Sequence, residues 1–427
     1  MPRALVLIFC ATLIAVPARG GFGCAGDCNG DGAVTIDELV RGVGIALGTT
    51  PLDQCAVFDC RASGSVTVDC LVQGVNAALA GCPDVGPRAT VSGPVTGGAG
   101  VPFAATTTFD LAEVGYTQIE YFVAGTASAY VNVGPLGADG RWSVAPADQA
   151  AYKTRLLVYR PIDAADFNGT VIVEWLNVSG GLDAGPDWLA AHTELTRSGY
   201  AWVGVSAQRV GVEGGEPLAG VVGSLVHPGD SFSYDIFTQV ARAVRQPDGL
   251  APLGDLAIER MIGAGESQSA FRLVVYINAI HPLGRLFDGY LVHSRGGFGF
   301  PLSEAPQAEI ATPVAPIRSD VDVPVLIFQT ENDLTFLNYV AARQPDSERV
   351  RVWEVAGTAH ADTYTIAVGM TDRGDDPSVA NLVVTAAPLP GLIECAAPIN
   401  SGPQHWVLKA AVAALDRWVR DGVAPPS

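Results

Sequence analysis

Residues 260–280 have the sequence RMIGAGESQSAFRLVVYINAI, and this stretch decides the fold class. Residues 260–264 are mainly apolar and predict a buried strand, and the apolar spacing of residues 270–280 predicts a helix. Between them lies the turn GESQS, residues 265–269. Small residues two positions before and two positions after Ser267 let the strand and the helix approach each other closely. The pattern therefore predicts a tight turn that presents Ser267 at the end of a central strand.

Outward from this turn, short β-branched runs alternate with amphipathic stretches. Besides the run before Ser267, strands are predicted at residues 117–123, 155–161, 171–177, 200–207, 289–294, 324–330 and 349–355. Helices are predicted at residues 184–198, 231–246, 267–281 and 403–420. Alternating strands and helices need crossover connections, which favour a mostly parallel sheet. Eight strands with the serine turn after the fifth predict the α/β-hydrolase fold, with an eight-stranded, mostly parallel sheet and helices on both faces.

The composition limits the classes of function. The 427 residues include 25 Lys and Arg against 44 Asp and Glu, which gives a formal charge of −19. Such a surface repels a phosphate backbone, so we expect no nucleic acid partner. The chain is 48% hydrophobic and 16% charged, and this is enough apolar material for a large buried core.

The first 20 residues have the pattern of an export signal. Arg3 supplies the positive charge, residues 4–16 are apolar, and residues 18–20 offer a cleavage site with small residues. The apolar run is too short to span a bilayer, and no later segment has about 18 consecutive apolar residues. We therefore expect a signal peptide at residues 1–20 and a secreted, periplasmic or cell-surface protein without a transmembrane segment.

Residues 21–84 contain an internal duplication. VTIDELVRGVGIALG at residues 34–48 and VTVDCLVQGVNAALA at residues 66–80 match at nine of fifteen positions. The loop before the first copy has the spacing of a twelve-residue calcium loop, in which alternate oxygens surround a hard cation and a final Glu closes the shell. An Asx-rich turn that caps a helix is the alternative. The predicted ligands are Asp27, Asn29, Asp31, Ala33 through its carbonyl oxygen, Thr35 and Glu38.

The second copy of the loop has Arg61, Ser63 and Cys70 at three ligand positions, so we expect no metal there. Six clustered cysteines predict up to three disulfides. The duplicated loop and helix resemble dockerin-like calcium modules, which implies attachment to a cell-surface partner; a structural spacer is the alternative. The Gly- and Pro-rich residues 85–102 are predicted to be a linker, and residues 103–427 to be the α/β-hydrolase domain.

A serine nucleophile needs a histidine to accept its proton and an acid to orient that histidine. In this fold the chain order is serine, acid, histidine. His360 follows the last predicted strand in a loop of small residues and is favoured, with His405 as the alternative. Beyond the seventh predicted strand, Asp333 is the favoured acid and Glu331 the alternative. Ser269 stands where the motif G-x-S-x-G has its second Gly.

Other residues are candidates for binding the substrate. We expect the backbone N–H of Gln268 and that of Asn177 or Val178 to bind the oxyanion. Arg295, directly after the sixth predicted strand, could bind a substrate carboxylate, with an internal salt bridge as the alternative. Trp188 could line an apolar pocket, although such aromatic residues more often belong to the core.

Seven stretches resemble a family of bacterial secreted α/β-hydrolase-domain proteins, over about residues 105–425. The resemblance implies a serine carboxylic ester hydrolase with Ser267, His360 and an acid at 331 or 333, but it does not imply a particular substrate. We expect a small or polymeric ester. This chemistry needs no cofactor, so we expect calcium to be structural. The alternatives are a surface-binding protein without catalysis, and an amidase or lactonase with the same triad. The stretches are VIVEWLNVSGG, GPDWL, GESQSA, YLVHSRG, QTENDL, WEVAGTAHAD and CAAPINSGPQHWVLKAAVAALDRWV.

Overall fold

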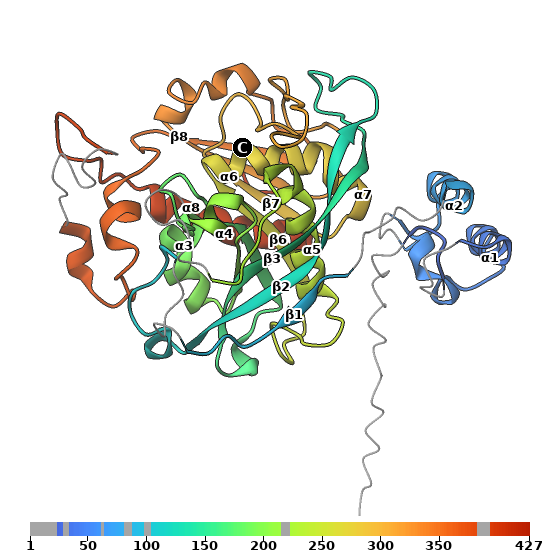
Figure 1. Ribbon diagram of the computed structural model, residues 1–427, viewed down its shortest axis with the longest axis horizontal. Coiled ribbons are helices and arrows are strands. Elements are labelled where there is room, and N and C mark those ends of the chain that lie inside the picture. The colour runs from blue at the N-terminus through green and yellow to red at the C-terminus, as the bar shows by residue number, and fades with distance from the viewer. Residues whose placement is uncertain are drawn as a thin grey trace, which may run out of the picture. The chain divides into compact units, whose positions relative to one another are not determined.

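The computed structural model describes residues 24–28, 34–60, 64–80, 88–97, 104–214, 223–381 and 393–427 (Figure 1). The chain divides into two compact units, residues 1–85 and 86–427. The predicted signal peptide lies outside the described residues, as do Asn29, Asp31 and Ala33 of the predicted calcium loop. Within the described ranges, no helix is both long and apolar enough to cross a bilayer.

The second unit is built on one nine-stranded sheet with the order β1-β2-β3-β5-β4-β6-β7-β8-β9. The strands β1, β2 and β3 are antiparallel neighbours, β3 is antiparallel to β5, and β4 to β9 run parallel. All eight predicted strands are present, and the α/β-hydrolase fold is confirmed. The bounds are β1 (Thr90–Ser92), β2 (Tyr116–Asn132), β3 (Val144–Pro161), β4 (Thr170–Trp175), β5 (Ala201–Val205), β6 (Arg260–Glu266), β7 (Gly289–His293), β8 (Val325–Thr330) and β9 (Val350–Val355).

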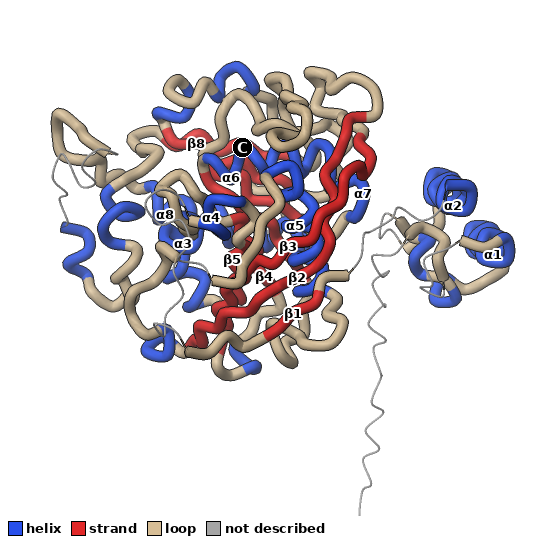
Figure 2. Tube along the Cα trace, in the orientation of Figure 1, coloured by secondary structure: helices blue, strands red, loops and turns tan. Residues whose placement is uncertain are grey.

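The ninth strand, β1, lies within the stretch predicted to be a linker. Its three residues pair with residues 122–124 of β2 at the edge of the sheet. Figure 2 shows β2 and β3 as a long diagonal hairpin with β1 beside it. Three residues are too few to show a periodic pattern, and the surrounding Gly and Pro residues gave the stretch the composition of a linker.

Both faces of the central strands are buried. In β4, Val171, Val173 and Trp175 belong to one hydrophobic core and Ile172 to the other, because successive side chains of a strand point to opposite faces. Each Val, Leu or Phe buried in these cores contributes about 1.5–3 kcal/mol of hydrophobic stabilisation. Burial on both faces explains why these strands have continuous apolar sequences.

Helices cover the sheet, and their buried side chains complete the two hydrophobic cores (Figure 1). Residues of α5 and α6 lie in the first core, and residues of α3 and α8 lie in the second. These four helices confirm the four predicted ones. Their bounds, with those of two short helices, are α3 (Pro186–Arg197), α4 (Arg209–Glu213), α5 (Ser233–Arg245), α6 (Gln268–Val275), α7 (His281–Gly284) and α8 (Gln404–Asp421).

The first unit packs two helices, α1 (Ile36–Ala46) and α2 (Val68–Ala80), around the buried ring of Phe58. A Cβ atom at Gly42 would lie 2.5 Å from that ring, and one at Gly74 would lie 2.6 Å from it. The two glycines stand at equivalent positions of the duplication, so each copy provides space for the same side chain. Two disulfides, Cys28–Cys55 and Cys60–Cys70, lie in the described part of this unit.

Candidate active site

Ser267 lies in a strained turn between β6 and α6. Its φ angle is 53°, in the left-handed region that residues with a side chain rarely adopt. The Ser267 N–H donates to the carbonyl oxygen of His293 at 2.9 Å, which ties the turn to β7. A Cβ atom on Gly265 would lie 3.2 Å from the carbonyl carbon and oxygen of Ser269, so glycine lets strand and helix approach. Because Gly265 has no Cβ atom, the turn has room for Ser269 in place of a second glycine, and Ser269 is fully buried.

Three predicted site residues form a continuous hydrogen-bonded series. Ser267 Oγ lies 2.7 Å from His360 Nε2, and His360 Nδ1 lies 2.7 Å from Asp333 Oδ1. Asp333 is fully buried, and its other carboxylate oxygen accepts the N–H of Thr330 at 2.7 Å. The His360 side chain is 20% exposed and Ser267 is half-buried, so both residues retain contact with solvent.

The other acid candidate, Glu331, is exposed and accepts the N–H of Gly357 at 2.6 Å. Between the two acids, Asn332 Oδ1 accepts the backbone N–H of His360 at 2.8 Å. Asn332 was not among the predicted site residues, although its place between the two candidate acids is visible in the sequence. The ring of the alternative histidine, His405, stacks on a tyrosine ring with centroids 3.7 Å apart.

The electrostatics of this series favour a proton on His360. Burial opposes ionisation of Asp333, but the hydrogen bond and the charge of His360 lower the pKa of Asp333 below its usual value. Burial also opposes the protonated form of His360, but its hydrogen bond to Asp333 and the charges of Glu266 and Asp333 raise the pKa of His360. The arrangement therefore favours the imidazolium form of His360.

The predicted oxyanion positions differ in whether their N–H groups are available. The N–H groups of Gln268, at the start of α6, and of Val178 have no backbone or side-chain acceptor among the described residues. The Asn177 N–H donates to the carbonyl oxygen of Ala184 at 2.8 Å, so Asn177 was wrong as the second donor. Its side-chain amide instead donates to the backbone oxygen of Glu266 at 3.1 Å and to Glu266 Oε2 at 3.3 Å.

A comparison with protein families identifies this architecture. The model of the alpha/beta hydrolase domain family matches residues 91–427. The chain belongs to this family. No curated protein matches the chain.

Several solved structures are similar to the hydrolase domain at low identity. One is a serine hydrolase without a lid from Xanthomonas campestris, with 15% identity over 55% of this chain and 86% of that chain and a TM-score of 0.30. Another is a fungal esterase from Rhizomucor miehei, with 13% identity over 70% and 86% and a TM-score of 0.33. A third is a carboxylesterase from Lactobacillus plantarum, with 12% identity over 64% and 95% and a TM-score of 0.34.

Both predicted substrate-binding side chains lie in the interior of the hydrolase domain. Arg295 is fully buried, and it donates from Nε to the carbonyl oxygen of Gly296 at 2.9 Å and from Nη2 to that of Ala315 at 2.8 Å. Trp188 is also fully buried and packs against Trp202 with ring centroids 5.3 Å apart. Neither side chain is therefore exposed to a substrate, because Trp188 packs in the second hydrophobic core and Arg295 is held by backbone carbonyl oxygens.

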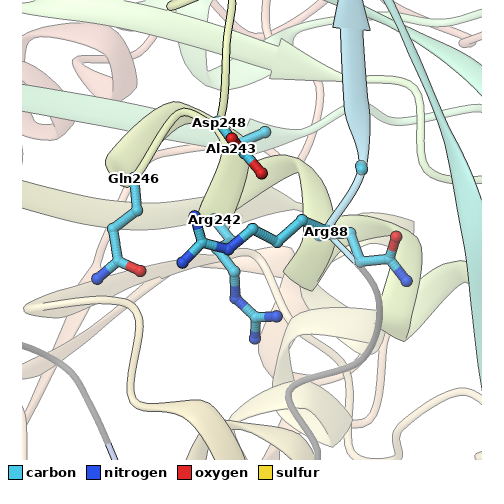
Figure 3. Close-up of a pocket in the computed structure, with 7 residues that line it drawn as sticks. Arg88, Arg242, Ala243, Gln246 and Asp248 are labelled. Carbon is cyan, nitrogen blue, oxygen red and sulfur yellow. The ribbon is translucent and has the colours of Figure 1, made fainter. Parts of the chain in front are cut away.

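Two hollows of the hydrolase domain are lined by residues other than the serine, histidine and acid. The one in Figure 3 has a volume of about 10 Å³, room for one water molecule at most. Its lining residues are Arg88, Ala89, Gln239, Arg242, Ala243, Gln246 and Asp248. A groove of about 860 Å³ lies along α3 and α8, with Asp372, His405 and Lys409 among its lining residues. Neither hollow forms part of the candidate active site.

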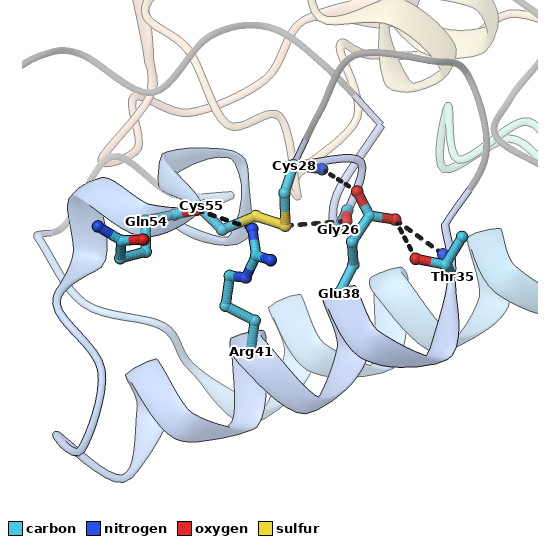
Figure 4. Close-up of a disulfide and its surroundings, with 7 residues drawn as sticks. All are labelled: Gly26, Cys28, Thr35, Glu38, Arg41, Gln54 and Cys55. Carbon is cyan, nitrogen blue, oxygen red and sulfur yellow. Dashed lines mark hydrogen bonds between the residues drawn. A yellow bond between two sulfur atoms is a disulfide. The ribbon is translucent and has the colours of Figure 1, made fainter.

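The described part of the predicted calcium loop brings two carboxylates into the interior of the first unit. Glu38 is 2% exposed and Asp27 is 7% exposed. One oxygen of Glu38 accepts the N–H of Cys28 at 2.8 Å, and the other accepts the N–H and O–H of Thr35 at 2.8 and 2.7 Å (Figure 4). Glu38 thus spans the loop from its start to the N-terminus of α1. Carboxylate oxygens are ligands of calcium, but the described contacts of Glu38 with Thr35 are those of a capping box, so Asp27 and Glu38 as calcium ligands stay a prediction.

Proposed function

We propose that this protein is an exported serine hydrolase that cleaves carboxylic esters through an acyl-serine intermediate. The observation that carries the proposal is the hydrogen-bonded series from Ser267 through His360 to Asp333, on a strained turn after the central strand. Each member has the geometry that its role needs, because the histidine faces the serine with one nitrogen and the buried acid with the other. Asp333, rather than Glu331, is the acid.

In the first half of the reaction, Ser267 Oγ attacks the ester carbonyl carbon while its proton passes to His360 Nε2. The carbonyl electron pair moves to oxygen, and the resulting oxyanion accepts hydrogen bonds from the N–H groups of Gln268 and Val178. Collapse of this intermediate breaks the ester C–O bond, and the leaving alcohol takes the proton from His360. Water then attacks the acyl-serine while its proton passes to His360 Nε2. His360 returns this proton to Ser267 Oγ as the carboxylic acid leaves.

An ester is the favoured substrate over an amide. The stretches that resemble bacterial secreted hydrolase-domain proteins imply carboxylesterase activity, and an alcohol is a better leaving group than an amine. An amide or a lactone would use the same residues, so substrate panels must distinguish these bonds.

The test compares the purified protein with its Ser267→Ala variant on p-nitrophenyl esters of short and long acids. We expect kcat/KM of the variant to fall by at least about 10³-fold, because the oxyanion donors alone give only residual catalysis. Anilide and lactone substrates serve as controls for the type of bond. Equal rates for wild type and variant would exclude Ser267 as the nucleophile for these esters.

The proposal extends to the first unit, which holds a structural calcium ion and attaches the enzyme to a cell-surface partner. The two disulfides support an oxidising location. Each copy of the duplication also exposes four apolar side chains at matching positions along its helix or at the end of it, and such surfaces often mark interaction sites. Removal of residues 24–84 should release the enzyme from the cell surface without loss of hydrolysis. The exposed residues are Ile36, Val40 and Val43 in α1 with Leu47 directly after it, and Val68, Val72, Val75 and Leu79 in α2.

A further inference from the structure

A second carboxylate lies beside the histidine, on the side that faces the serine. Glu266, the last residue of β6, is only 7% exposed, and its Oε1 lies 3.6 Å from His360 Nε2. This nitrogen already makes its hydrogen bond to Ser267, so Glu266 acts on it through charge. His360 therefore has an acid near each nitrogen, Asp333 at Nδ1 and Glu266 at Nε2.

Burial disfavours the ionised carboxylate of Glu266, and a protonated His360 offsets this effect. In the described part of the chain, His360 is its one ion-pair partner within 4.0 Å. The other titratable groups around it are His293 of β7, Asp187 of α3 and Asp333. His293 is itself engaged by Asp187, with Nδ1 and Oδ1 2.8 Å apart. Two further buried acids border this group, since Glu174 of β4 interacts with Asp187 and Asp362 interacts with His293.

We propose that Glu266 is a positioning residue that controls the protonation of His360 through its charge. This inference rests on the proposed function and adds a residue to it. The role differs from that of Asp333, which fixes the ring orientation through a hydrogen bond. Glu266 also accepts the side-chain N–H of Asn177, next to the oxyanion donor Val178, so the same residue holds the oxyanion loop.

The direction of the pH effect follows from the charges. Burial raises the pKa of Glu266 to about 7, and the charges of His360 and His293 oppose that rise. An ionised Glu266 in turn raises the pKa of His360. The two groups titrate as a coupled pair, and hydrolysis requires neutral His360. Activity is therefore present above the titration of the pair and is lost as the pH falls through it.

The experiment measures the His360 pKa directly by NMR titration of the imidazole in wild type, Glu266→Gln and Glu331→Gln. Glutamine keeps the size of Glu266 and an acceptor for Asn177 but removes the charge. We expect the His360 pKa to fall by about one unit in Glu266→Gln. Glu331→Gln is the matched control, because the same change at an exposed site near His360 should leave the pKa of His360 unchanged. The acid limb of kcat/KM should move with the His360 pKa.

An unchanged His360 pKa in Glu266→Gln would overturn the inference, even if hydrolysis fell equally at every pH, because that result indicates a purely structural role. If Glu266→Gln does not fold, ¹³C titration of the Glu266 carboxyl in wild type and His360→Ala tests the same coupling from the other side. The Glu266 pKa should then rise in His360→Ala, and an unchanged value would contradict the coupling. The NMR readouts need no substrate. If the His360 pKa shifts but the protein cleaves no ester, the proposed function is rejected and the inference about Glu266 is kept.

Discussion

At the scale of single residues, two carboxylates that stand two positions apart make different contacts. Asp333 is buried against His360 Nδ1, whereas Glu331 is exposed and accepts the N–H of Gly357. The sequence left the choice of acid open because both residues follow the same strand. The short helical turn at Asn332–Leu334 decides which side chain points inward, and no periodic pattern predicts such a turn.

This difference predicts unequal effects of removing the two charges. Asp333→Asn should lower kcat by about 10⁴-fold, because an amide favours the wrong tautomer of His360. Glu331→Gln should lower kcat by less than about tenfold, since it weakens only one contact of the histidine loop. Steady-state kinetics near pH 8, with circular dichroism as the check on folding, measures both. A loss in Glu331→Gln as large as that in Asp333→Asn would contradict the assignment of the acid.

At the scale of elements, the sequence predicts those whose burial leaves a strong pattern. The eight long strands and four helices are present because buried strands are continuously apolar and amphipathic helices keep their spacing. The availability of a backbone N–H leaves no such pattern, which is why Asn177 and Val178 could not be distinguished. The sequence also could not show that Arg295 is buried, because its partners are backbone carbonyl oxygens, which any sequence provides.

We expect the loop before α1 to bind calcium and the equivalent loop of the second copy not to bind it. Asp27→Asn should weaken calcium binding by the full-length protein at least about tenfold, because it removes one anionic ligand. Asp59→Asn, the equivalent change in the second copy, should have no effect. Asp59 accepts the N–H of Gly64 there, and the amide oxygen of Asn can replace it. Isothermal titration calorimetry compares the three proteins. Equal losses in both variants, or loss of ester hydrolysis on chelation, would contradict a structural calcium ion confined to the first loop.

At the scale of the whole molecule, the chain combines two units with different sources of stability. The second unit buries two hydrophobic cores on either side of a nine-stranded sheet. The first is small, and disulfides support the few side chains around Phe58. The candidate active site lies entirely in the second unit, where Ser267, His360 and Asp333 meet from β6, the loop after β9 and the turn after β8.

The central claim is that the fold activates Ser267 as a nucleophile, and covalent labelling tests it most directly. The full-length protein is treated with a fluorophosphonate, digested and analysed by mass spectrometry, beside its His360→Ala variant. We expect one adduct in the wild type, on the peptide that contains Ser267, and loss of that adduct in the variant, because serine needs the histidine to accept its proton. A wild-type protein that gains no adduct, or gains it on another residue, would contradict the account.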